Sequence, residues 1–356
     1  MKLHTFKIGG VHPAEHKIAA EVATRPAPLP TQAIFPLSQH IGAPAKPVVQ
    51  KGDTVKVGTL LAEAGGFVSA PIYSSVSGTV AKIDTAIDAT GYRKPAIIVK
   101  VEGDEWEPGI DRTDTLETLA AHPELTAEAI VEQIKWAGVT GMGGAGFPTF
   151  IKLCPPPTAK AECVILNGVE CEPYITSDTR AMIDYSFDVI AGCRILQKFL
   201  KVPRIVFGIE DNKPECIERY RELVSHEQNM EVMPLKAMYP QGGEKVLIYH
   251  VTGEKVPEGK LPLDVGAVVL NCTTISSIAR YCRTGLPLVK KCVTVDGSAV
   301  KNPMNVLVPI GMRMKDVFEA TGGFKEEPEK VISGGPMMGF AMFDLNVPCT
   351  KTSSAI

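Results

Sequence analysis

The feature that most constrains the fold is a regular alternation of strand and helix patterns between residues 126 and 284. Short aliphatic runs, such as CVILNGV at 163–169 and AVVLN at 267–271, have the continuous apolar character of strands buried on both faces. Amphipathic helix patterns separate these runs, at 126–136, 177–200 and 213–225. The alternation predicts a mainly parallel, Rossmann-like α/β sheet with helices on both faces.

A different, all-β pattern fills residues 34–103. Its runs are short and broken by Gly, Pro and Asp, and they include GDTVKVG at 52–58 and SGTV at 77–80. These two motifs resemble the signatures of the two halves of a barrel-sandwich hybrid domain of the biotinyl/lipoyl type. Carrier domains of that type present a modifiable lysine at the hairpin between the halves, whereas GGFVSAP at 65–71 has none. We therefore expect a structural or partner-docking unit and not a swinging-arm carrier.

Composition narrows the class of protein. The 356 residues are too many for one ordinary core, and the formal net charge of −3 gives no broad basic field, so nucleic acid is not an expected partner. The first residues lack the apolar core of a secretory signal, and no apolar run approaches the roughly 20 residues that span a bilayer. We expect a cytoplasmic protein without a direct membrane span, whose membrane association is made through partners.

The nine cysteines are scattered and form no CxxC pair. This spacing argues against a zinc ribbon and against an iron–sulfur cluster held by these residues. The simplest interpretation is a set of reduced thiols, many of them buried. No metal site is predicted.

The strongest motif is GMGGAGFPT at 141–149, which has four glycines in six residues. It satisfies GxGxxG, but a helix pattern precedes it, so it is not the usual dinucleotide fingerprint. Such a loop lets backbone N–H groups approach a phosphate or an aromatic ring. A helix suggested at 149–153 would point its first amides at the same anion, with Lys152 as a nearby charge. The alternative is a tight turn between packed elements.

Further polar residues follow predicted strands, where the ligand crevice of an open α/β sheet lies. Asn167 is followed by Glu170 and Glu172. Asparagine can donate and accept hydrogen bonds at a flavin edge, and the carboxylates can bind ribose hydroxyls or raise each other's pKa. Read alone, the carboxylates suggest a solvated acidic loop, and Asn271 after the strand at 267–271 suggests a helix cap.

GMGGAGFPTFIKL resembles the flavin loop GxGGAGFPTxxK of the NADH-oxidising subunit of complex I and of the C subunit of the Rnf complex, which carries the same domain. The acidic loop is similar to the N-x-x-E-x-E-P pattern of that family, and YPQGGE at 239–244 is similar to the Rnf form of a third loop. Val169, Cys171 and Gly243 stand where complex I has aspartate, serine and glutamate. The resemblance implies NADH contacts from Phe147, Glu172 and Glu244. It implies FMN contacts from Gly141, Gly143, Gly144, Lys152, Asn167, Glu170, Tyr239, Glu244, Asn271 and Thr274, and no catalytic side chain.

Residues 285–335 show a strand, a turn at Asp296-Gly297, a second strand and a helix. They resemble the small β-grasp module, of the SLBB type, that follows the flavin domain in this family. The tail at 336–356 has no obvious capping element, and we expect that the chain has been cut. The predicted α/β multidomain protein thus has an extended, proline-rich arm at 1–33 that wraps over another domain, a barrel-sandwich hybrid domain at 34–103, an FMN/NADH-binding domain at 126–284, the β-grasp module and the tail.

By the same resemblance, the chain is expected to be the NADH-binding flavoprotein subunit of a membrane-bound, ion-translocating ferredoxin:NAD oxidoreductase. Hydride transfer between nicotinamide and FMN needs stacked rings and excluded water more than an acid or a base. In the family, motifs for two 4Fe-4S clusters follow the β-grasp module, and these motifs are absent from this sequence. The expected partners are the other subunits of the complex and a ferredoxin-type carrier, at the cytoplasmic side of the cell membrane.

Two alternatives stay open. The A subunit of the sodium-pumping NADH:quinone reductase shares the domain order but lacks a working flavin loop, so a chain of that kind would be a flavin-free scaffold. Flavoprotein cobalamin reductases also resemble this arrangement and would change the electron acceptor. The intact GMGGAGFPT loop and Lys152 favour a flavoprotein over the scaffold.

Overall fold

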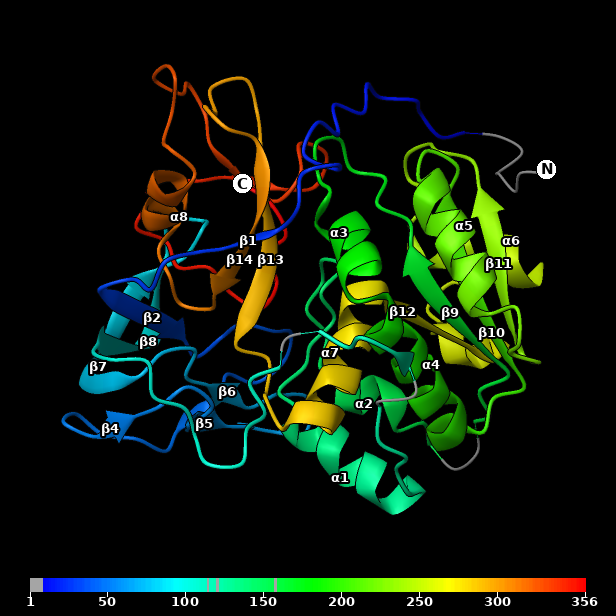
Figure 1. Cartoon of the computed structure of the whole chain (residues 1–356), viewed down its shortest axis with the longest axis horizontal. Coiled ribbons are helices and arrows are strands. Elements are labelled where there is room, and N and C mark those ends of the chain that lie inside the picture. The colour runs from blue at the N-terminus through cyan, green and yellow to red at the C-terminus, as the bar shows by residue number, and fades with distance from the viewer. Residues whose placement is uncertain (1–8, 114, 120–121, 157–158) are drawn as a thin grey trace.

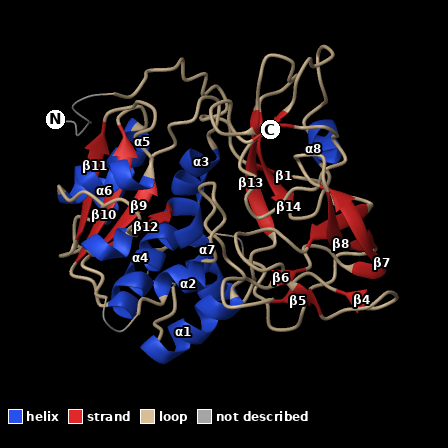
Figure 2. Cartoon of the chain, turned by 180° about the vertical axis from the view of Figure 1, so that it is seen from behind, coloured by secondary structure: helices blue, strands red, loops and turns tan. Residues whose placement is uncertain are grey.

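The computed structural model describes residues 9–113, 115–119, 122–156 and 159–356, and Figures 1 and 2 show the chain from opposite sides. The barrel-sandwich unit consists of two antiparallel sheets with strand orders β2-β8-β7-β4 and β3-β5-β6. Phe35, Leu61, Val80 and Ile97 come from different strands of this unit and are fully buried. The strands are β2 (Gln32–Pro36), β3 (Lys46–Pro47), β4 (Thr54–Val55), β5 (Leu60–Glu63), β6 (Ile72–Tyr73), β7 (Gly78–Ile87) and β8 (Arg93–Val101).

The α/β domain is built on a four-stranded sheet in which all neighbours are parallel, as the alternation predicts. The strand order is β11-β10-β9-β12. Successive residues of a strand enter two different cores: Val164 and Leu166 lie in one, Cys163 and Ile165 in the other. The strands are β9 (Cys163–Gly168), β10 (Arg204–Glu210), β11 (Met230–Leu235) and β12 (Ala267–Asn271).

Helices cover both faces of this sheet (Figure 1). The core on one face includes residues of six helices, and the core on the other face includes Leu247, Ile248 and Val251 of α6 (Glu244–Thr252). Thr126 caps the first helix, since its Oγ1 accepts a hydrogen bond from Ala129 N at 3.2 Å. The six helices are α1 (Ala127–Trp136), α2 (Thr149–Leu153), α3 (Ser177–Asp184), α4 (Ser186–Leu200), α5 (Pro214–Leu223) and α7 (Cys272–Thr284).

Two helices differ from the sequence pattern. The single helix expected at 177–200 is interrupted at Tyr185, whose backbone (φ −120°, ψ 30°) leaves the helical region. The interruption allows α3 to pack against the β-grasp strand β13 (Lys290–Val295) while α4 packs along α7. The helix patterns found in the sequence do not include α6, which forms between Gly243 and Gly253 in the Gly- and Pro-rich segment 239–266, and its three buried aliphatic residues complete the sheet's second core.

The β-grasp module pairs β13 antiparallel with β14 (Met304–Pro309) and adds α8 (Met314–Ala320). A hairpin of β15 (Ile332–Ser333) and β16 (Phe340–Ala341) projects from it. The N-terminal arm contributes β1 (Arg25–Pro26), which pairs in parallel with β14, so the described part of the arm does lie along another domain. Residues 1–8 of the expected arm lie outside the described residues.

The tail returns to the β-grasp sheet. Thr294 N donates a hydrogen bond to Ser354 O at 2.9 Å, and Ile356 N donates to Thr294 O at 2.8 Å. Lys351, one residue in this returning segment, is buried where three modules meet: its Nζ donates to Pro71 O of the barrel-sandwich unit and to Gly138 O of the α/β domain, both at 2.6 Å. The tail therefore joins the other modules together.

Candidate functional site

The sheet order places a topological switch point between β9 and β12. Chain connections lead from β9 to β10 and β11 on one side, while β12 lies on the other side. Ligands of open α/β sheets bind outside the carboxyl ends of the strands at such a point. Asn167 and Asn271 end these two strands and are register partners. The loops predicted to bind a cofactor therefore start at the edge of the sheet where folds of this kind bind their ligands.

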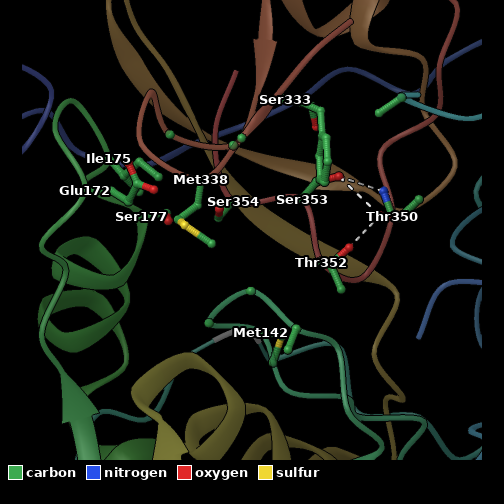
Figure 3. A pocket seen from close by; sticks show the side chains of 18 of the residues that line it. Met142, Glu172, Ile175, Ser177, Ser333, Met338, Thr350, Thr352, Ser353 and Ser354 are labelled. Carbon is green, nitrogen blue, oxygen red and sulfur yellow. Dashed lines mark hydrogen bonds between the residues drawn. The ribbon is translucent and has the colours of Figure 1, made fainter. Parts of the chain in front are cut away.

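A cavity of about 810 Å³ opens at this point, between the α/β domain, the barrel-sandwich unit and the C-terminal region (Figure 3). Figure 3 shows Met142 below, Glu172 on one side, and Met338 with the segment of Thr350 and Thr352 above. Five of the predicted site residues line it: Gly143, Gly144, Glu170, Glu172 and Tyr239. The remaining seven do not: Gly141, Phe147, Lys152, Asn167, Glu244, Asn271 and Thr274.

The glycine loop is anchored at its base and open at its tip. Gly141 N donates to Phe147 O at 2.8 Å, which closes the loop, and Met142 N donates to Thr274 Oγ1 at 3.0 Å. Gly143 and Gly144 are exposed toward the cavity, and Gly144 has φ +137°, a conformation that L side chains rarely adopt. Among the described residues, no protein acceptor forms a hydrogen bond with the N–H of Gly143 or Gly144. The tip thus presents free backbone donors to the cavity.

Three of the predicted flavin contacts act as supports for the loops. Asn271 caps α7, as its Oδ1 accepts from Thr274 N at 3.2 Å, and Thr274 holds Met142. Asn167 Nδ2 donates to Gly242 O at 3.0 Å, and its Oδ1 accepts from Val169 N at 3.0 Å. Both asparagines therefore have their amide groups occupied by protein partners. The helix-cap interpretation of Asn271 is confirmed.

Asp178, at the start of α3, is a cavity residue that sequence reasoning missed. Its carboxylate accepts from Asn271 Nδ2 at 2.6 Å and from Thr273 Oγ1 at 2.7 Å. It therefore links the first turn of α3 to the first turn of α7 at the cavity wall. An acidic residue in the first turn of a helix is ordinary, so no local signal distinguished it.

Lys152 and Glu244 form an ion pair at 2.5 Å between Nζ and Oε1. Lys152 lies on α2 (Thr149–Leu153), directly after the glycine loop, and Glu244 is the first residue of α6. Their side chains are 28% and 41% exposed, so the pair is solvated and each group remains available to a ligand. The pair lies beside the cavity wall, outside the lining itself.

Glu170 lines the cavity but is nearly enclosed by protein. Its carboxylate accepts from Asp178 N at 2.7 Å, Thr179 N at 3.3 Å and Thr179 Oγ1 at 2.7 Å. Burial raises the pKa of Glu170, and Lys17 opposes this shift. Because Oε1 accepts from Asp178 N and Oε2 accepts from Thr179 N, both in the first turn of α3, Glu170 serves first as a cap of that helix.

Glu172 has one free carboxylate oxygen. Oε2 accepts from Met337 N at 3.0 Å, whereas Oε1 is buried and has no partner within the described part of the chain. A buried acceptor without a donor is costly, so this atom marks a place where a ligand hydroxyl can bind. Cys171, between the two glutamates, also lines the cavity, and burial raises the pKa of its thiol, which disfavours the reactive thiolate.

Phe147 does not line the cavity, whereas several residues from distant segments of the chain do. Phe147 is half-buried, and its carbonyl closes the glycine loop. His40, Met338 and Thr352 line the cavity from the barrel-sandwich unit, the β15–β16 hairpin and the tail. No sequence signal connected these three residues to the site, because they come from segments without a recognised motif.

The arrangement fits FMN. An 810 Å³ cavity lies within the range of small-molecule sites, and its floor offers free N–H groups of the kind that bind phosphate or a flavin edge.

All nine cysteines are free thiols and all but Cys154 and Cys171 are buried, as predicted. Over the described residues no cluster of side chains could hold a metal ion, and no helix there is long and apolar enough to cross a bilayer.

Three family descriptions match successive parts of the chain. Residues 4–104 match the RnfC barrel sandwich hybrid domain, residues 134–280 the Nuo51 FMN-binding domain, and residues 292–341 the SLBB domain. These matches confirm the predicted fold class and the resemblance to the complex I flavoprotein domain.

Solved structures support the same fold. The crystal structure of an NAD+-reducing [NiFe]-hydrogenase in the air-oxidized state superposes with a TM-score of 0.56 at 23% identity, over 68% of this chain and 49% of that chain. Since the identity is low, this similarity concerns the fold alone.

Curated relatives cover nearly the whole chain. It is 46% identical, over 99% of its length and 76% of the relative's, to the C subunit of the proton-translocating ferredoxin:NAD(+) oxidoreductase complex of Clostridium ljungdahlii. It is 42% identical, over 100% and 79%, to the C subunit of the Na(+)-translocating complex of Acetobacterium woodii. To the C subunit of the ion-translocating oxidoreductase complex of Rhodobacter capsulatus the identity is 37%, over 99% and 68%. The chain belongs to the RnfC family, the C subunits of the Rnf-type ferredoxin:NAD oxidoreductase complexes.

Proposed function

We propose that this chain binds FMN in the cavity and, as the C subunit of an Rnf-type complex, exchanges electrons between NAD(H) and an iron–sulfur carrier. The observation that carries the proposal is the open tip of the glycine loop, where Gly143 and Gly144 line the cavity and their N–H groups have no protein acceptors among the described residues. A side chain at either position would obstruct the approach of a ring or phosphate. Asn271, Thr274 and Asn167 support this loop and its neighbour from behind.

The proposed dinucleotide contact is Glu172. Its free Oε1 can accept a hydrogen bond from a ribose hydroxyl. Lys152 supplies positive charge beside the glycine loop, and Glu244 sets its position. Phe147 is also a proposed NAD(H) contact, at the base of the glycine loop and outside the cavity lining.

Bound in this cavity, FMN would supply the link between two-electron hydride chemistry and one-electron transfer. The chain's own residues bind, orient and shield the reactants. Met142 is buried under the loop, and Met338 lies over the cavity on the hairpin (Figure 3). Both residues line the cavity and place apolar surface beside the proposed flavin site.

The proposed partners are the other subunits of the complex and a ferredoxin-type carrier, at the cytoplasmic side of the membrane. The relatives' names give ferredoxin and NAD(+) as the reactants of their complexes. The 4Fe-4S clusters are proposed for a region that follows the β-grasp module in the family.

The test is a titration of the purified chain with FMN, followed by anaerobic addition of NADH while the flavin absorbance is recorded. Stoichiometric binding and bleaching by NADH support the proposal. A folded chain that binds no FMN would instead match the flavin-free scaffold. Adding cobalamin or ferredoxin to the reduced protein then distinguishes the two acceptors, since only the true acceptor should reoxidise the flavin rapidly.

A further inference from the structure

Lys17, on the N-terminal arm, reaches under the acidic loop at 170–175. Its Nζ donates to three backbone carbonyls: those of Glu170 at 2.8 Å, Glu172 at 2.9 Å and Ile175 at 2.6 Å. An ammonium has three N–H donors, so these bonds occupy all of them. One side chain thus holds the loop at its start, its middle and its end.

Two other arm residues contact the same loop. Tyr174 N donates to Glu15 O at 2.8 Å, and the rings of His16 and Tyr174 stack with centroids 4.9 Å apart and planes 14° apart. Tyr174 has φ +67°, a left-handed conformation that non-glycine residues adopt only where their surroundings hold it. The arm supplies these surroundings, so the loop's shape depends on the arm.

The carboxylates around Lys17 offset part of the cost of burying its ammonium. Burial lowers the pKa of Lys17, while the carboxylates of Glu170, Glu210 and Glu15 favour its charged form and Lys213 disfavours it. A small cavity of about 60 Å³ lies beside the contact and is lined by arm residues and by the loop. The arm therefore packs against the loop along a partly buried polar interface.

We propose that Lys17 is a positioning residue for NAD(H) binding, which acts through the backbone of the 170–175 loop to direct Glu172 into the cavity. The inference rests on the proposed role of Glu172. Lys17 fixes the backbone of Glu172 from the arm side, and Met337 N holds its Oε2 from the hairpin side. Only Oε1 is then left for a ligand hydroxyl. The arm and the hairpin, from opposite ends of the chain, together set the direction of one carboxylate.

The experiment uses the full chain loaded with FMN and titrated with NAD+ and NADH, with flavin fluorescence as the signal. Lys17→Met should weaken dinucleotide binding by about tenfold, because the loop loses three charge-assisted hydrogen bonds, and should leave FMN affinity within about twofold. Lys100→Met is the matched control: it removes an exposed lysine that forms an ion pair with Glu102, and it should change neither affinity. Lys17→Arg keeps the charge and should restore part of the loss.

A double-mutant cycle separates positioning from general stabilisation. If Lys17 acts through Glu172, Lys17→Met added to Glu172→Gln should cause no further loss of dinucleotide affinity beyond that of Glu172→Gln alone. If the two substitutions cause additive losses, Lys17 does not act through Glu172. If Glu172→Gln is impaired but Lys17→Met keeps the parent's dinucleotide affinity, Lys17 has no positioning role, although the Glu172 contact stands. Normal dinucleotide affinity in Glu172→Gln would overturn the proposed contact itself. Should Lys17→Met fail to fold, Lys17→Arg replaces it in the same cycle.

Discussion

The ammonium of Lys152 lies 2.5 Å from the carboxylate of Glu244, across the junction between the glycine-loop helix α2 and helix α6. Exposed ion pairs of this kind contribute about 0.2–1 kcal/mol to folding, so stability alone gives little reason for the contact. The pair joins two loops that both surround the cofactor cavity. Its role is better tested through binding than through unfolding.

Lys152→Met should weaken FMN binding by about tenfold, or ~1.4 kcal/mol, because a charge beside the phosphate-binding loop is lost. Glu244→Gln should weaken FMN binding less than Lys152→Met does, since the ammonium keeps its charge and loses only the carboxylate that positions it. Equilibrium titration with FMN measures both effects. Lys198→Met, which removes an ammonium 3.7 Å from Glu124 at the surface, is the control. Equal FMN affinity in Lys152→Met and the parent chain would show that this lysine does not serve the flavin.

Gly144→Val should abolish measurable FMN binding while the chain remains folded. The substitution strains the backbone at φ +137° and puts a branched side chain into the open cavity floor. Gly297→Val is the matched control, since Gly297 has φ +128° and also has no atom within 4 Å of an added Cβ, but lies in the β-grasp turn. Both variants should lose similar stability in urea unfolding. Retained FMN binding in Gly144→Val would refute the loop assignment.

Gly335→Ala should weaken NADH binding more than FMN binding. An added Cβ would lie 2.3 Å from Glu172 Oε2, so the hairpin turn or the carboxylate must move and the bond from Met337 N is disturbed. A loss of about fivefold to tenfold is expected from one weakened charge-assisted hydrogen bond. Gly66→Ala, whose Cβ would meet only the Ala43 side chain at 3.1 Å, controls for the substitution itself. Parallel losses of FMN and NADH affinity would point to general damage to the cavity.

Lys351 should make stability increase with pH. Burial lowers the pKa of Lys351 from 10.5 to about 7, so between these values the unfolded chain binds more protons than the folded chain. Its contribution to the unfolding free energy therefore rises with pH across this window, by at most about 1.4 kcal/mol per pH unit. Urea unfolding at about pH 7 and about pH 9 measures, at each pH, the difference in unfolding free energy between the parent chain and Lys351→Met. A difference that does not grow with pH would contradict the lowered pKa.

Local patterns in the sequence determined the strands, most helices and the chemistry of the loops. The strands β9, β10 and β12 coincide with apolar runs, and Thr126 and Asn271 cap helices as their residue types suggest. These features depend on neighbours within a few residues, which is why the sequence reveals them.

Tertiary contacts decided which residues face the cavity and which support it. Asn167 and Asn271 have the right chemistry for a ligand, yet protein partners from 75 and 93 residues away occupy their amides. Asp178 and Met338 have no distinguishing local pattern, but they line the cavity because α3 and the hairpin converge there. A side chain's chemistry is fixed by its residue type, which the sequence shows directly. Its partners are set by packing between distant segments, which only the tertiary structure shows.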